Sequence, residues 1–115
     1  MILSELVAIQ KQFDSKHKGR FKWNSEISDE TISLLGFTML ALSGEVGEAS
    51  NIVKKIWRGD NSLDDKREEL QEEIADIFSY LLKLCYQLDF DLEKTYCKKL
   101  KRNVERFANY ANEEQ

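Results

Sequence analysis

The sequence has no proline, and its 115 residues include only five glycines, two cysteines and one histidine. Proline and glycine are the residues that most often end helices and shape turns, so their scarcity favours long helices. Two thiols do not make a disulfide framework. Both lie in helical patterns, which favours a reducing, cytoplasmic setting.

Positive charge is also in short supply: 17 Lys and Arg face 21 Asp and Glu, for a net charge of −4. This balance argues against a nucleic-acid polymer as partner, because such binding needs clustered cations. A single nucleotide that arrives with a divalent metal is still compatible. We expect no signal peptide, since Glu5 comes too early for one, and no membrane partner, since no apolar run approaches spanning length.

Apolar residues at helical spacing predict four helices in one domain, residues 1–115. A polar stretch with aromatic anchors separates the first two helices. The expected bounds are about Ile2 to Lys16, Ser28 or Asp29 to Gly59, about Leu63 to Leu88, and the Asp91 cap to about Tyr110. The predicted fold class is all-α. It is a four-helix, bundle-like protomer whose second and third helices form a long antiparallel hairpin.

Two acid pairs fall on this hairpin, Glu45 with Glu48 and Glu73 with Asp76. Residues three apart share a helical face. Counted from Asn61 in the turn, Glu48 lies 13 residues before it and Glu73 lies 12 after it, so the pairs should meet at one level. A solvated acidic face is the alternative. Glu45 and Glu73 instead share their directions with apolar residues, so they point toward the core and need a counter-charge.

All-oxygen ligands favour a hard cation, Mg²⁺ or Mn²⁺. A di-iron bundle is disfavoured because it needs Glu-x-x-His on two helices, and the only histidine, His17, lies in the polar stretch. Glu69 and Glu72 extend the acidic run of the third helix. They fit a solvated side, although Glu72 could also be an outer ligand or a general base.

Lys99, Asn103 and Arg106 are spaced so that they project together from the fourth helix. A solvated cationic face is the alternative, but such a stripe opposite a metal site suits a triphosphate. Lys54, near the end of the second helix, is a candidate for a further contact to the triphosphate. Trp23 is a candidate for stacking a base, although such aromatics are more often core or oligomer contacts.

Three segments resemble the MazG-type nucleotide pyrophosphohydrolases, which are related to dCTP pyrophosphatase and dimeric dUTPase. They are residues 42–48 (LSGEVGE), 72–81 (EEIADIFSYL) and 99–106 (KLKRNVER), and the similarity spans about residues 38–107. The resemblance implies Mg²⁺ on the two acid pairs and nucleotide contacts from Tyr80, Lys99 and Asn103. It also implies a homodimer or homotetramer with active sites shared between subunits. Relatives that prefer dCTP carry Trp where Lys55 stands, so a cytosine preference does not follow.

The function expected from these residues and the resemblance is hydrolysis of a (deoxy)nucleoside triphosphate to monophosphate and pyrophosphate, as nucleotide-pool housekeeping. Glu45 or Glu72 would accept the proton of the attacking water, and the sequence does not choose between them. Two alternatives stay open. One is a non-catalytic helical interaction module, and the other is a phosphoribosyl-ATP pyrophosphohydrolase.

Overall fold

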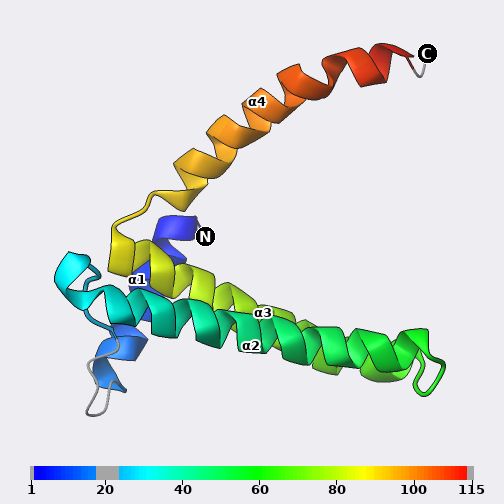
Figure 1. Cartoon of the computed structure of the whole chain (residues 1–115), viewed down its shortest axis with the longest axis horizontal. Coiled ribbons are helices and arrows are strands. Elements are labelled where there is room, and N and C mark those ends of the chain that lie inside the picture. Colours follow the sequence, from blue (N-terminus) through cyan, green and yellow to red (C-terminus); the bar gives the residue numbers. More distant parts are fainter. Residues whose placement is uncertain (1, 18–23, 114–115) are drawn as a thin grey trace.

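The computed structural model describes residues 2–17 and 24–113, and every element within them is helical. The prediction of an all-α chain of four helices is confirmed (Figure 1). The elements are α1 (Leu3–Lys16), the short 3-10 turn η2 (Asp29–Thr31), α2 (Ile32–Trp57), α3 (Leu63–Leu88) and α4 (Leu92–Glu113).

A tight turn joins α2 to α3 and makes them the predicted antiparallel hairpin (Figure 1). Gly59 has φ 90°, a left-handed conformation that costs glycine little and other residues more. Ser62 then caps α3, its hydroxyl accepting a hydrogen bond from the Asp65 backbone N–H at 3.1 Å. The turn is short and capped, so residues equally distant from it lie side by side.

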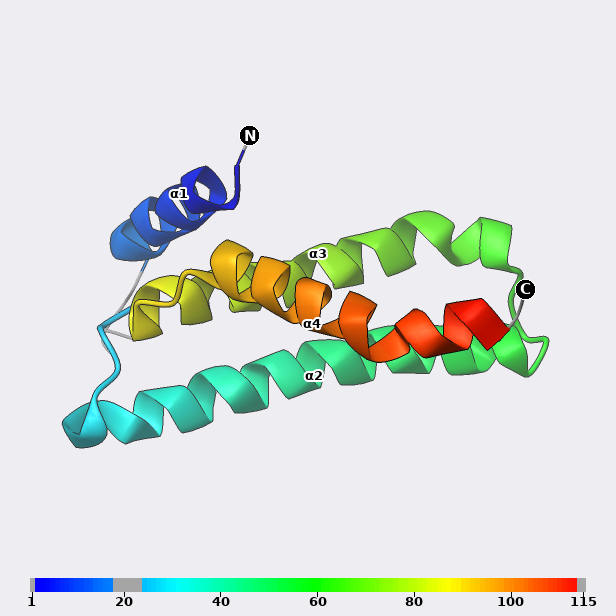
Figure 2. The same ribbon diagram turned by 90° about the horizontal axis from the view of Figure 1, so that it is seen from above.

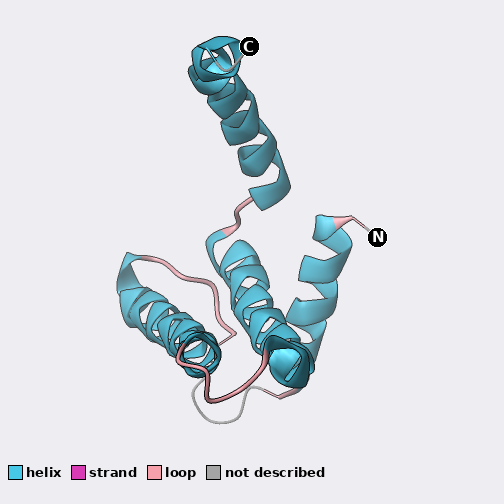
Figure 3. Cartoon of the chain, turned by 90° about the vertical axis from the view of Figure 1, so that its right-hand side faces the viewer, coloured by secondary structure: helices cyan, strands magenta, loops and turns pink. Residues whose placement is uncertain are grey.

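α1 and α2 both pack on α3 (Figures 2 and 3). The buried apolar residues among those described are few: Ala49, Leu82 and Cys85. Buried polar groups fix the helices to one another as well. The Thr38 hydroxyl donates to Gln87 Oε1 at 3.2 Å, and the Ile27 N–H donates to the Gln87 carbonyl at 2.8 Å.

The face that α1 turns to α3 differs from the apolar stripe that marks α1 as a helix. Ile9 and Phe13 are 53% and 55% exposed, whereas Asp14 is fully buried. At about 100° per residue, Asp14 shares its direction with Leu3, Val7 and Gln10. This neighbouring arc meets α3 and leaves two large apolar side chains uncovered.

α4 leaves the other helices after a left-handed Asp89 (φ 55°) and does not pack along them within the described residues (Figure 1). The radius of gyration is therefore 18.0 Å, where a compact chain of this length has about 13 Å. One face of α4 is an exposed apolar stripe of Tyr96, Leu100, Val104 and Phe107. We call it the α4 stripe.

The expectation that no apolar run approaches membrane-spanning length is wrong. The segment Asp29–Trp57 is long enough to cross a membrane, and an 18-residue stretch of it reaches a mean hydropathy of 1.2. Length and composition alone are weak evidence for a span. Two carboxylates, Glu45 and Glu48, stand in α2, and charges at the centre of a bilayer are costly. Only 11% of that 18-residue stretch is buried within the chain.

Candidate metal centre

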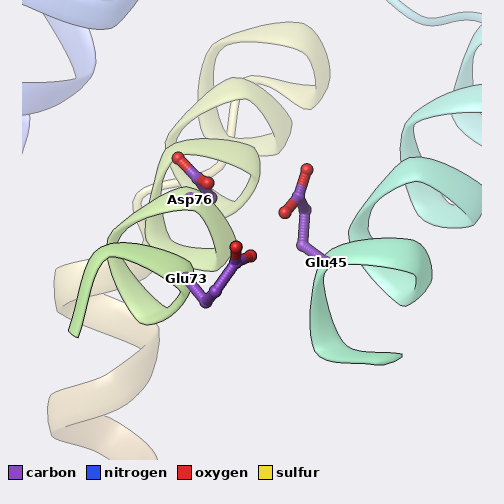
Figure 4. A group of neighbouring side chains, drawn as sticks. All are labelled: Glu45, Glu73 and Asp76. Carbon is purple, nitrogen blue, oxygen red and sulfur yellow. The ribbon is translucent and has the colours of Figure 1, made fainter. Parts of the chain in front are cut away.

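The hairpin brings three carboxylates from its two helices to one point (Figure 4). Glu45 comes from α2, and Glu73 and Asp76 come from successive positions on one face of α3. One carboxylate oxygen of each lies within 4.8 Å of the others. Figure 4 shows Glu45 reaching across the gap between the helices toward the other two. We call these three residues the acid cluster.

Two oxygens of the acid cluster are buried without a hydrogen-bond donor: Glu45 Oε2 and Glu73 Oε2. Buried carboxylate oxygens normally have donors, because desolvation otherwise destabilises the charged form. Burial first, and then the Glu48 and Glu45 carboxylates, raise the pKa of Glu73 to about 7. Burial, followed by repulsion from Glu48 and Asp76, also raises the pKa of Glu45 above its usual value. Both shifts indicate a site short of positive charge.

A divalent cation fits this deficit better than a basic side chain. None of the ion pairs found among the described residues involves the acid cluster. The donors are all carboxylate oxygens, which hard cations prefer. The two orphaned oxygens are the observation on which the fit depends, because they supply ligand atoms that no protein group uses.

The family described as MazG nucleotide pyrophosphohydrolase domain matches residues 36–107, more than half of the sequence. That range includes both acid pairs, all of α3 and most of α4. This chain belongs to the MazG family. Divalent metals are typical of MazG proteins, in keeping with the acid cluster.

A curated protein similar to this MazG chain is the Gene 37 protein of Mycobacterium phage L5, which is 37% identical over 62 residues. The match covers 52% of this chain and 54% of that protein, so the chain spans about half the length of the relative. No solved structure matches the chain significantly.

Glu48, the fourth predicted ligand, is exposed and lies just outside the acid cluster. Its carboxylate is close enough to act on the pKa values of both Glu45 and Glu73. Glu72 is exposed beside the cluster, on the neighbouring side of α3. Lys54 is exposed on α2 and lines a shallow surface hollow with Glu48. These three residues therefore border the cluster or lie further along its helices.

The predicted nucleotide-binding residues divide into two groups. Tyr80 is half-buried beside the acid cluster, and burial, together with the charges of Glu45 and Asp76, raises the pKa of its hydroxyl. Lys99, Asn103 and Arg106 are exposed on α4, which in this chain runs away from the hairpin (Figure 1). Trp23 lies outside the described residues.

A pocket next to the acid cluster contains residues that the sequence reading missed. Gln10 of α1 and Lys83 of α3 line it together with Glu45 and Asp76. The sequence feature that could have indicated this pocket is Asp14. It lies one turn after Gln10 and faces the same direction of the helix as Leu3 and Val7. A carboxylate in such a direction requires partners, and those partners are on α3.

Proposed function

We propose that this MazG domain hydrolyses a (deoxy)nucleoside triphosphate to the monophosphate and pyrophosphate in a Mg²⁺-dependent reaction. The single observation that carries the proposal is the acid cluster, where three carboxylates from two helices lie within 4.8 Å and two of their oxygens are buried without donors. The family match supports pyrophosphohydrolase chemistry at this site.

In this proposal Glu45, Glu73 and Asp76 hold Mg²⁺, and Glu48 completes the set from the rim. Mn²⁺ satisfies the same oxygen ligands. When bound, the ion supplies positive charge for the phosphate oxygens and lowers the pKa of water. The role of the hairpin is to place three acids from two helices around one point, with Glu48 at the rim, before any substrate arrives.

A carboxylate takes the proton of the attacking water. The water oxygen forms a bond to the α-phosphorus, the bond from that phosphorus to the α,β-bridging oxygen breaks, and pyrophosphate leaves. Glu72 or Glu45 accepts the proton. Two variants separate these candidates. If Glu72 is the base, Glu72→Gln loses hydrolysis and retains Mg²⁺ binding, whereas Glu45→Gln is expected to lose Mg²⁺ binding as well.

The chain is proposed to work as a homodimer or homotetramer. A single copy buries little apolar surface and exposes the α4 stripe, an arrangement that a second copy would correct. At about 100° per residue, Lys99, Asn103 and Arg106 border one side of that stripe. Docking of the stripe on another copy would therefore bring these donors to the rim of its hairpin, where the phosphates bind. Lys54, Tyr80 and Trp23 remain proposed substrate contacts.

The proposed setting is the cytoplasm, without a membrane or a nucleic-acid polymer as partner. Cys85 and Cys97 are both free thiols, in keeping with a reducing compartment. The apolar character of α2 is explained by burial between copies, because its two mid-helix acids are unsuited to lipid.

Pyrophosphate release from a panel of canonical and modified dNTPs, with phosphoribosyl-ATP included, tests the function directly. Release that requires Mg²⁺ is expected from the wild type. Glu48→Ala should lower the rate about a hundredfold or more. Glu68→Ala, an exposed acid of the same helix hairpin that lies outside the site, is the matched control. Full activity of Glu48→Ala excludes the metal role of that residue, and cleavage of phosphoribosyl-ATP alone reassigns the substrate.

A further inference from the structure

Two hollows of different character flank the acids along the hairpin. One, of about 260 Å³, lies toward the turn between α2 and α3 and has Glu48 and Glu73 on its wall. Its other side chains are mostly polar or charged. They include Asn51 and Lys55, the apolar Ile52, and Lys66, which pairs with the Glu69 carboxylate at 3.2 Å. We call it the turn-side groove.

The other hollow, of about 460 Å³, lies further from the turn, where α1 meets α3. Glu45 and Asp76 form its side toward the cluster, and the exposed Ile9 and Phe13 of α1 and the ring of Tyr80 form apolar and aromatic walls. We call it the α1 pocket. A nucleoside triphosphate has the same polarity, with an aromatic base at one end and pyrophosphate at the other, so the base fits the α1 pocket.

Asp14 lies behind the α1 pocket and is completely buried. Its Oδ1 accepts a hydrogen bond from Gln10 Nε2 at 2.9 Å, and its Oδ2 accepts one from the Tyr86 hydroxyl. Lys83 Nζ is 4.0 Å from Oδ1 and 4.5 Å from the centre of the Tyr80 ring. One buried carboxylate thus holds two polar side chains that line the pocket, Gln10 and Lys83.

The chemistry of Asp14 fixes which way the Gln10 amide is turned. An ionised carboxylate only accepts hydrogen bonds, so Gln10 must present its NH₂ group to Asp14. Its carbonyl oxygen is then the atom left to accept from a ligand. Lys83, held between Asp14 and the Tyr80 ring, fixes the aromatic wall beside it.

We propose that the α1 pocket takes the nucleobase and that Asp14 is a positioning residue for base selection, acting through Gln10 and Lys83. Gln10 accepts a hydrogen bond from an amino or imino N–H on the edge of the base. The turn-side groove, on the other side of the acids, takes the pyrophosphate end. This inference rests on the proposed hydrolase function.

Asp14→Asn tests the proposal at nearly constant shape. The new amide still accepts from Tyr86, but its NH₂ donates to Gln10, whose amide must then turn its own NH₂ toward the pocket. We expect KM for the preferred dNTP to rise about tenfold with little change in kcat, and the ranking of the four canonical dNTPs to change. Gln10→Leu removes the hydrogen-bond acceptor altogether and should reduce the differences in KM among the four dNTPs.

Thr38→Val is the matched structural control. It removes a buried polar contact between α2 and α3, from Thr38 to Gln87, and Thr38 does not line the α1 pocket. It should lower Tm and leave the ranking of dNTPs unchanged. The proposal is overturned if Asp14→Asn and Gln10→Leu both keep the wild-type ranking, or if Thr38→Val alters it to the same extent.

The same panel separates failure of this inference from failure of the proposed function. A wild type that cleaves none of the triphosphates contradicts the proposed function. A wild type that cleaves them, together with variants that keep its ranking of dNTPs, contradicts only the base-selection role. Binding of deoxynucleoside monophosphates without Mg²⁺, followed by calorimetry, adds a readout independent of hydrolysis. Wild type should bind them with a base preference that Gln10→Leu weakens, and equal affinities of the two proteins for every base overturn the proposal.

Discussion

α3 and α4 are helices of similar length in one chain, 26 and 22 residues, yet their surroundings differ. α3 is packed by α1 on one side and by α2 on another, whereas α4 has no comparable neighbour within the described residues. The acids of α3 are accordingly in position beside Glu45 of α2 in a single copy, and one buried oxygen of Glu73 and one of Glu45 lack donors. The basic residues of α4 are not near them. One copy therefore assembles the proposed metal ligands, and the helix proposed to bind phosphate has its apolar face uncovered.

Mixing two inactive variants tests whether α4 serves the acid cluster of another copy. Glu73→Gln removes a proposed metal ligand, and Lys99→Met removes a proposed phosphate contact. If the site is shared, a mixed two-fold dimer has one intact site, and an equal mixture recovers roughly a quarter of wild-type hydrolysis. Pyrophosphate release after co-refolding measures this. No recovery above the two separate variants shows that α4 acts within its own chain.

Leu100→Asp should weaken assembly. A buried leucine contributes about 2 kcal/mol, and a charge in the α4 stripe adds a desolvation cost, so association falls at least about tenfold. Light scattering coupled to size exclusion measures the mass. Lys98→Asp introduces the same side chain on the opposite face of α4 and should leave the mass unchanged. Equal behaviour of the two variants contradicts a role for the stripe.

The acid cluster should make the metal-free protein less stable as pH rises. The pKa of Glu73 in the folded state is about 7 against an ordinary value of 4.5. The native state therefore binds more protons than the unfolded chain in this window, and the free energy of unfolding declines from about pH 4.5 to about pH 7. Tm with a chelator at several pH values is the measurement. Glu73→Gln should flatten the decline, and parallel curves for the two proteins contradict this cause.

Ser62→Ala should affect the hairpin least. The substitution removes the hydroxyl that accepts from the Asp65 N–H, and loss of such a cap costs about 1 kcal/mol. Tm should fall by about 4 °C in thermal unfolding while pyrophosphate release stays at the wild-type level. A loss of activity without loss of stability shows that the turn has a role in the site that this account does not assign to it.

The hairpin was predictable because its evidence is local. The predicted bounds of the third helix match α3 residue for residue, and counting from the turn places Glu45 and Glu73 on facing helices. The path of α4 was not predictable. The spacing of its apolar residues indicates that one face is covered, but it does not indicate which surface covers that face. The Asp14 contacts were also missed, because an acid on a packed arc needs a partner that only the crossing of α1 and α3 supplies.

Mg²⁺ titration followed by thermal unfolding tests the central claim most directly. If the acid cluster holds the ion, Tm of the wild type at pH 7.5 rises with Mg²⁺ concentration, and Glu73→Gln loses that rise. Glu45→Leu should also be insensitive to Mg²⁺. A wild type whose Tm does not respond to Mg²⁺, together with a Glu45→Leu variant that is more stable than it, shows that the helices form a bundle without a metal centre.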